Sequence, residues 1–533
     1  MVKKRFATAA LGVASVLAAS QAHAQSAGNS EQEIALLKQQ LHMLEQKLDK
    51  LQKQTTANTA TAAHTKAEAR AVARSEAQAA VANANAALPV KGPTASSGVA
   101  VTMPNNRPTI CTEDQQNCVA ITSRVHWDVG GYDYRPNTAA TVPQKLDGGE
   151  NLRRARIGVV GKFFGDWNYA LIYDFGGSSD GFGGVAPGSL PGGGVSGVEN
   201  AYLSYTGLKP FGGKMAIEAG VMDLDWTLDE ATSSNDILFM ERASVGIIAQ
   251  NIAAGDFRSA VGTRWWNDQL WLGGYVTGPT TGAIHSASSI SPPGTSEQYG
   301  GVVRVAGNPI SGKDYSVHMG ADAEWLVQPP RNLVTQAQTL TLSDRPELRI
   351  DPTTLISTGA IANVSGAQVY GAEAAATYGS LIAQGEYYWF NLDRTANTGL
   401  PPFGASNLKF DGGYAQVGYV LTGETHAYNP STASYGGIKP ANPFSLAGGG
   451  WGAWEVAGRV SRMNLNDQLA TAAGIAGGRQ TVYTLALNWY VNGNVRFMLD
   501  YLHGNVSKQA SPVSAADTGS NFDAIAMRTQ VAF

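Results

Sequence analysis

Cysteine is nearly absent from this sequence of 533 residues, and strong net charge is missing as well. The formal net charge is −4, which argues against a general nucleic-acid binder, so we predict no nucleic-acid partner. Charged residues make up only 15% of the chain, whereas glycine contributes 62 residues, well above average usage. No long apolar helix follows the N-terminal segment. This profile is typical of a β-rich protein with glycine-rich loops.

Sequence patterns for catalysis or cofactor binding are also lacking. The eight histidines are scattered and never show the i, i+4 or H-E-x-x-H spacing of metal ligands. No Walker or dinucleotide-binding fingerprint occurs. Residues 177–181 match G-x-S-x-G, but that motif requires a strand-to-helix elbow, and a glycine-rich loop follows here. We therefore predict no enzymatic activity, no cofactor and no metal site.

The N-terminus has the features of a bacterial export signal. A basic start, KKR, precedes a short apolar segment, and the tripeptide AHA at 22–24 forms an A-x-A cleavage site. The apolar segment is too short to span a membrane as a helix. We predict that residues 1–24 are a signal peptide and that the mature chain begins at Gln25.

Residues 25–55 are predicted to form a coiled coil. Apolar residues recur at the a and d positions of heptads: Ile34, Leu37, Leu41, Leu44, Leu48 and Leu51. The alternative is a single amphipathic helix packed on its own domain, but the next hundred residues offer no core for such packing. We expect this segment to associate with further copies of itself. The pattern does not decide between two strands and three.

Residues 56–118 are predicted to be a spacer in the periplasm, rich in Ala, Thr and Pro and partly helical. The only two cysteines, Cys111 and Cys118, lie near its end, and in an oxidising periplasm they would close a small disulfide loop. A metal-binding pair is the alternative, although no histidine or further cysteine lies nearby to complete such a site.

Residues 119–533 are dominated by the two-residue alternation of β-strands. In one example, Val495, Phe497, Leu499 and Tyr501 alternate with Asn494, Arg496, Met498 and Asp500. Roughly sixteen such segments have one apolar or aromatic face and one polar or small face. A soluble sandwich also alternates, but aromatic residues at strand ends and the export signal favour a membrane barrel. The predicted fold is all-β, an antiparallel transmembrane barrel of sixteen strands in the outer membrane.

The lengths of the connections support the same fold. Several turns are tight, and Asn492-Gly493 is a strong type I′ signal. Other connections are long and rich in Gly, Pro and Ser: 176–197, 278–297, 328–365 and 422–449. Outer-membrane barrels have short turns on one side and long loops on the other. We therefore expect these four long connections to share the extracellular side.

One segment between predicted strands, Asp223–Ser244, lacks the alternation. The hydroxyl residues at 232–234 are suited to cap a helix, and Asp236 is suited to its first turn. Leu238, Phe239 and Met240 supply an apolar anchor. We predict a loop that folds into the lumen of the barrel and carries charged residues to the narrowest point of a pore.

A basic strand face precedes this loop, in the stretch LRRARIGVVGK. Arg154, Arg156 and Lys162 share one face, and a cation facing lipid near the membrane midplane would cost roughly 2–4 kcal/mol. This face is therefore predicted to line the lumen, with Arg153 on the opposite face at the start of the strand. Inward arginines would bind anions or pair with luminal acids that hold the loop, and both roles remain open.

Stretches spread over most of residues 119–533 resemble the phosphate-selective porins of the O/P type. The matching stretches include RRARIGVVGKFFGDWNYALIYDF, LDEATSSNDILFMERAS, SDRPELRIDPTTLISTG, FDGGYAQVGYVLTGETHAY and TLALNWYVNGNVRFMLDY. The resemblance implies a trimeric channel of sixteen strands whose third extracellular loop folds inward and carries the A-T-S-S stretch. The N-terminal coiled coil is similar to the periplasmic extension that some members of the family carry.

The resemblance also implies a set of pore residues. The family's paired arginines match Arg153 and Arg154, its E-R arginine matches Arg242, and its constriction aspartate matches Glu199. A lysine that precedes A-T-S-S in phosphate-specific members is replaced by Glu230. The candidate residues for pore constriction and solute binding are thus Arg153, Arg154, Arg156, Glu199, Glu230 and Arg242.

The sequence therefore predicts an outer-membrane porin for passive diffusion of small hydrophilic solutes and inorganic ions. The alternative is an anion-selective or phosphate-selective channel. A coiled-coil adhesin or envelope tether with a barrel anchor is more distant, since the stalk is short and the strands lie in one chain. Expected partners are outer-membrane lipid, further copies of the chain in a homotrimer, and peptidoglycan, which the periplasmic coiled coil would contact.

Overall fold

The computed structural model describes residues 98–137, 145–176, 197–255, 258–280, 296–395 and 407–533. Five further residues, His42, Gln46, Lys47, Asp49 and Lys50, are described as helical. The chain divides into two compact units, Met1–Ala95 and Ser96–Phe533. The predicted signal peptide, most of the coiled coil and the spacer up to residue 97 lie outside the described residues.

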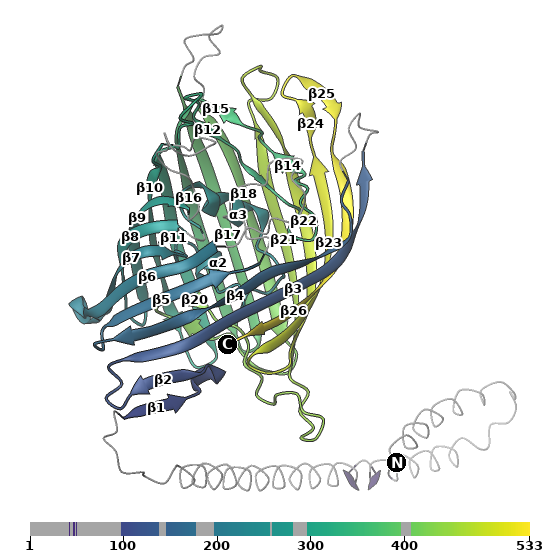
Figure 1. Ribbon diagram of the computed structural model, residues 1–533. Helices are drawn as coiled ribbons and strands as arrows, with labels where there is room; N and C mark the ends of the chain where they lie inside the picture. The colour runs from purple at the N-terminus through teal and green to yellow at the C-terminus, as the bar shows by residue number, and fades with distance from the viewer. Residues whose placement is uncertain are drawn as a thin grey trace, which may run out of the picture. The chain divides into compact units, whose positions relative to one another are not determined.

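Within the described ranges, sixteen strands form a closed antiparallel barrel (Figure 1). Each strand pairs with the next along the chain, and the last pairs with the first from Ser520↔Pro136 to Ala532↔Arg124. The barrel strands are β3 (Cys118–Pro136), β4 (Gly149–Phe163), β5 (Trp167–Asp174), β6 (Gly197–Leu208), β7 (Lys214–Met222), β8 (Arg258–Trp266), β9 (Leu270–Thr280), β10 (Tyr299–Ser311), β11 (Tyr315–Gln328), β16 (Val364–Tyr378), β17 (Leu381–Arg394), β18 (Leu408–Val420), β21 (Ala453–Asp467), β22 (Ile475–Tyr490), β23 (Val495–Ser507) and β26 (Ser520–Ala532). The predicted fold class is confirmed.

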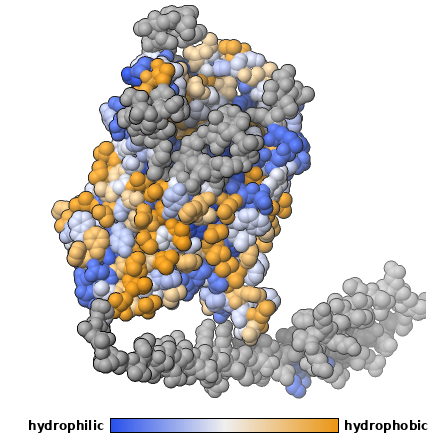
Figure 2. Space-filling view, viewed as in Figure 1, coloured by the Kyte–Doolittle hydropathy of each residue, from blue (hydrophilic) through white to orange (hydrophobic). Residues whose placement is uncertain are grey.

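The alternation in the sequence becomes an outer and an inner face of the barrel wall. On β22, Leu485 is 63% exposed on the outside, whereas the neighbouring Thr484 points inward and is 1% exposed. Figure 2 shows apolar residues gathered over the strands on the visible face. Closure pairs every strand on both sides, which leaves no open sheet edge in the lipid.

The remaining described elements are short. Two helices, α2 (Leu228–Ala231) and α3 (Ser244–Ala253), lie in the connection between β7 and β8, and none of the described helices could cross a membrane by its length and hydropathy. Small hairpins and single turns of 3-10 helix occupy other connections: η1 (Pro104–Asn106), η2 (Pro210–Gly212), β12 (Thr339–Leu340) with β15 (Ile361–Ala362), β13 (Ser343–Asp344) with β14 (Ile356–Ser357), β19 (Tyr428–Asn429) with β20 (Ser434–Tyr435), and β24 (Gln509–Ser511) with β25 (Ser514–Asp517).

The chain enters the barrel through a hairpin of β1 (Val99–Thr102) and β2 (Thr109–Thr112). β2 pairs with the first residues of β3, where Cys111 lies opposite Cys118 and forms a disulfide with it. The C-terminal strand β26 pairs with β3 only from Arg124 onward. The hairpin therefore covers the part of the β3 edge that β26 leaves unpaired, a position where an open edge would invite other chains to pair.

One long connection lies on the side of the barrel opposite to the predicted one. Leu381, directly after the tight β16–β17 turn, pairs with Tyr419 at the end of β18, so residues 421–452 leave the barrel on the short-turn side. The prediction that 422–449 lies among the long extracellular loops is wrong. Successive connections alternate between the two ends of the barrel, and an odd number of strands separates this connection from the long loops. The length of a connection does not show at which end it lies.

This short-turn connection folds back into the lumen through the β19–β20 hairpin. The Trp271 indole donates to Ser431 O at 3.0 Å, and Arg304 Nη2 donates to Ala433 O at 2.8 Å. Ser434 Oγ donates to Ala231 O in α2 at 2.9 Å. The hairpin thus contacts the barrel wall and the inward-folded β7–β8 connection, and it narrows the lumen from the short-turn end.

Candidate pore constriction

The predicted constriction loop, Asp223–Ser244, lies in the connection between β7 and β8, and α2 and α3 of this connection lie within the barrel (Figure 1). The Thr227 side chain accepts a hydrogen bond from Glu230 N at 3.1 Å and caps α2. The Glu386 carboxylate on β17 accepts from Leu228 N at 2.9 Å and Asp229 N at 3.2 Å. These bonds satisfy amide groups that the first helical turn leaves unpaired.

The predicted helix start at 232–234 is wrong. α2 ends at Ala231, and the next helix begins only at Ser244. The carboxylate that stabilises the earlier start, Glu386, lies 158 residues from Leu228 in the chain. Local capping residues could not reveal this long-range contact.

A buried network of four charges fixes the end of the loop to the barrel wall. Arg528 on β26 donates to both oxygens of Asp128, at 2.6 and 2.7 Å, and to Glu241 Oε1 at 2.7 Å. Arg153 donates to the same Glu241 at 2.8 and 3.1 Å. Burial opposes ionisation of Glu241, but Arg153 and Arg528 hold its pKa well below its usual value. An ionised Glu241 therefore bridges two arginines of the wall.

Arg153 points into the lumen, and the prediction that it lies on the opposite strand face is wrong. His126 pairs with Arg154 and Trp127 with Leu152, so Arg153 is the extra residue of a β-bulge in β4. The bulge turns both Arg153 and Arg154 inward, and each is 2% exposed. Strict two-residue alternation cannot accommodate adjacent inward residues, which is why the sequence pattern misplaced Arg153.

Arg156 and Glu199 form a second buried network, between β4 and β6. Arg156 Nε donates to Asp174 Oδ2 at 2.8 Å, and its Nη1 forms an ion pair with Glu199. All three side chains are buried. Arg156 faces inward as predicted, and its charge is offset by two carboxylates.

Glu230 is paired with Arg242 within the loop itself. Their closest charged atoms, Glu230 Oε2 and Arg242 Nε, are 3.4 Å apart, and Asp229 Oδ2 lies 3.5 Å from the same Nε. Arg242 also donates to Thr232 O at 2.9 Å. Glu230, the acid at the position where the resemblance implies a lysine, thus forms an ion pair with Arg242 of the same loop.

The candidate residues surround a cavity of about 260 Å³ between the loop and strands β3–β6. Its charged lining combines the arginines Arg124, Arg154, Arg156 and Arg242 with the carboxylates Glu199, Asp223, Asp225 and Glu230. The cavity thus collects five of the six predicted residues, and Arg153 lies in the anchoring network instead.

Arg124 on β3 is a pore residue that the sequence reasoning missed. It donates to Ser234 Oγ at 2.6 Å and to Ser233 Oγ at 3.2 Å, the two serines of the A-T-S-S stretch. Arg124 also lines a neighbouring cavity of about 190 Å³ toward the short-turn end. Its place on the same strand face as His126 and Asp128 was a usable signal, because alternate residues share a face.

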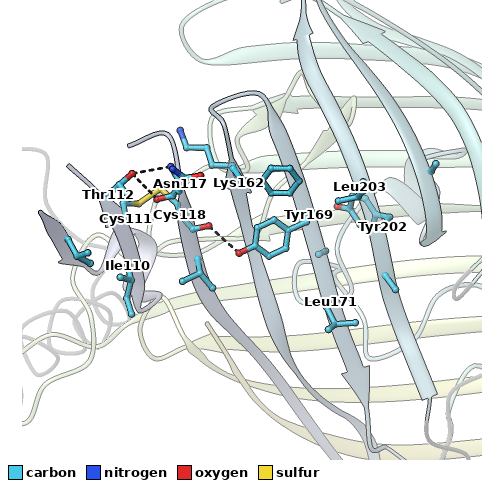
Figure 3. A pocket seen from close by; sticks show the side chains of 16 residues that line it. Ile110, Cys111, Thr112, Asn117, Cys118, Lys162, Tyr169, Leu171, Tyr202 and Leu203 are labelled. Carbon is cyan, nitrogen blue, oxygen red and sulfur yellow. Dashed lines mark hydrogen bonds between the residues drawn. A yellow bond between two sulfur atoms is a disulfide. The ribbon is translucent and has the colours of Figure 1, made fainter. Parts of the chain in front are cut away.

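An apolar groove of about 910 Å³ lies beside the entry hairpin and is distinct from this charged cavity (Figure 3). Ile110, Leu171 and Leu203, which line it, are exposed on the outside of the wall. The Tyr169 hydroxyl donates to Cys118 O at 3.3 Å. Across the described part of the chain, no group of three His, Cys, Asp or Glu is arranged to hold a metal.

Comparison with known proteins agrees with this geometry. The model of the family described as phosphate-selective porin O and P matches residues 119–533. The chain belongs to this family. It is an outer-membrane barrel protein of the porin class, and the resemblance seen in the sequence is confirmed.

Two relatives differ in their sequence identity to this chain and in the length over which they match it. An uncharacterised protein of Caulobacter vibrioides is 34% identical over 279 residues, covering 52% of this chain and 50% of the relative. The chain thus matches about half the length of that relative. Porin O of Pseudomonas aeruginosa is 24% identical over 386 residues, covering 67% of this chain and 77% of the relative.

Two solved barrels share less sequence with this chain. OmpT of Vibrio cholerae has a TM-score of 0.42 at 12% identity, over 77% of this chain and 97% of OmpT. An anion-selective porin from Comamonas acidovorans has a TM-score of 0.41 at 12% identity, over 78% of this chain and 99% of that porin.

Replacing Arg528 with methionine tests whether the buried network holds the loop. The substitution leaves Asp128 without its bidentate partner, and breaking such a buried pair costs roughly 3–5 kcal/mol. We expect the loop to leave the wall part of the time, so single-channel recordings should show a larger and noisier current. Arg479→Met, at an exposed position on β22, is the matched control. Unchanged conductance and noise in Arg528→Met would contradict this role.

Proposed function

We propose that this chain forms a water-filled channel for passive diffusion of small hydrophilic solutes and ions. The observation that carries the proposal is the pairing of charges around the cavity: Glu230 with Arg242, and Glu199 with Arg156. Paired charges leave a polar constriction with little net field, which suits many small solutes and none in particular. The channel would carry out no covalent chemistry on these solutes.

The proposed working form is a homotrimer embedded in outer-membrane lipid. Two observations support it: the heptad repeat in residues 25–55, which favours association of copies, and membership of the O/P porin family. The apolar outer face of the strands suits contact with lipid. The N-terminal segment would lie in the periplasm.

The coiled coil would act as a tether to peptidoglycan. A chain without residues 25–95 should conduct as the full-length protein does, because the barrel unit begins at Ser96. The same truncated chain should lose co-sedimentation with purified peptidoglycan. Equal co-sedimentation of the two chains would refute the tether.

An anion-selective channel is the second candidate, and two arginines favour it. Arg124 and Arg154 line the cavity, and among the described residues neither forms a salt bridge. The family's description names phosphate. Against phosphate stands Glu230, since changing a lysine to glutamate shifts the local charge by two units. At about 5 Å and an effective dielectric near 20, each unit is worth about 3 kcal/mol to an ion.

Glu230→Lys separates the two candidates. With chloride as the current carrier, millimolar phosphate should leave the wild-type current unchanged, whereas the variant should be blocked, because a lysine and a released Arg242 would face the cavity together. Glu230→Gln, which removes charge without adding a cation, should show weaker block. Block of the wild type would favour the phosphate channel. If phosphate did not block the Glu230→Lys channel, the assignment of Glu230 to the constriction would be refuted.

A further inference from the structure

His426, in the short-turn connection between β18 and β21, lies between two hydrogen-bond acceptors. Its Nδ1 is 2.8 Å from Gly436 O, and its Nε2 is 2.7 Å from Glu455 Oε1 on β21. A carbonyl oxygen has no hydrogen to donate, so Nδ1 must donate to it. The second contact also needs a hydrogen, either on Nε2 or on the carboxyl group. A neutral imidazole beside an ionised carboxylate carries one hydrogen fewer than the two contacts require.

No neighbouring donor supplies the missing hydrogen. The other oxygen of the carboxyl group, Glu455 Oε2, accepts from the Tyr490 hydroxyl at 2.6 Å and from Asn488 Nδ2 at 3.4 Å. These two donors leave Oε1 to the histidine. His426 and Glu455 are both buried, and burial makes an unsatisfied contact between two acceptors costly. The pair therefore holds one additional proton in this conformation.

The same contacts connect the short-turn connection to the constriction loop. Asp236 of the loop accepts a hydrogen bond from Gly437 N, which belongs to the same peptide group as the carbonyl oxygen that His426 contacts. Arg496 on β23 donates to the carbonyl groups on both sides of Asp236, at 3.1 and 2.9 Å. Asp236 and Arg496 are two further charged groups that face the pair from neighbouring elements, and their charges offset each other.

Two other buried histidines, His318 and His126, have partners that a neutral imidazole satisfies. His318 accepts at Nδ1 from the Tyr428 hydroxyl at 3.1 Å, which leaves the hydrogen on Nε2 for Glu373 at 3.0 Å. One ring nitrogen of His126 faces the Arg154 guanidinium, which donates. The need for an additional proton is therefore a property of the pair on β21 and not of every histidine in the lumen.

We propose that a proton shared by His426 and Glu455 holds the short-turn connection inside the lumen, and that loss of this proton widens the channel. Without the proton, one of the two contacts of His426 brings two acceptors together. The folded-in state binds one proton more than the released state, so a rise in pH favours release. The proposal rests on the function proposed above, because it requires a conducting pore, and it adds regulation to that pore.

Single-channel conductance of the full-length protein in planar bilayers tests the proposal. At constant salt, we expect the wild-type conductance to be at least about 1.5-fold higher at about pH 9 than at about pH 5.5, a range that spans the ordinary titration of histidine. Glu455→Gln offers Nε2 an amide hydrogen that does not titrate, so its conductance should stay low at both pH values. His426→Phe has no ring nitrogen, so its conductance should be high at both.

The opposite directions of these two variants distinguish a shared proton from a purely structural contact, which would change both in the same direction. His503→Gln is the matched control and should keep the pH step, since His503 contacts Asp523 at 2.8 Å on the outside of the barrel, where its side chain is 46% exposed. Equal wild-type conductance at the two pH values would overturn the proposal, as would a pH step that persists in both variants. Absence of conductance at every pH would instead defeat the channel itself.

Discussion

The structure depends on the ion-pair network that joins Glu241 of the constriction loop to Arg153 and Arg528 of the wall. Arg528 also holds Asp128, so the network connects β3, β4 and β26, where the barrel closes on itself. Pairs of this kind stabilise only when geometry and further hydrogen bonds repay desolvation, and these contacts are bidentate or shared. The position of the loop, and hence the shape of the cavity, follows from this network.

The charged side chains that line the cavity are ones that do not belong to the network of Glu241, Arg153, Arg528 and Asp128. Wall arginines either bind the loop, as Arg153 and Arg528 do, or pair across the wall, as Arg156 does. Arg124 binds the loop through Ser233 and Ser234, and Arg154 lines the cavity without a salt bridge among the described residues. Glu230, which stands where the resemblance implies a lysine, forms an ion pair with Arg242 of the same loop. The constriction is therefore polar, and most of the charges that line it are paired.

Much of the fold could be predicted from the sequence, because lipid outside and a polar lumen inside impose the same alternation on every strand. The inward positions of Arg154 and Arg156 followed from it. Arg153 did not, since the β-bulge that turns it inward leaves no mark on the alternation. The sequence did not predict that α2 begins after Thr227, because the distant Glu386 carboxylate stabilises that start. It also did not predict the end of the barrel at which residues 421–452 lie, because the number of preceding strands determines that end. The sequence singled out Glu230 as a candidate, but its ion pair with Arg242 follows only from the folded loop.

The central claim is that the charges at the constriction balance one another. The most direct measurement is the reversal potential of wild-type channels in a planar bilayer under a potassium chloride gradient. Balanced charges predict a reversal potential near zero, with similar permeability for potassium and chloride. A reversal potential approaching the equilibrium potential of either ion would contradict the account.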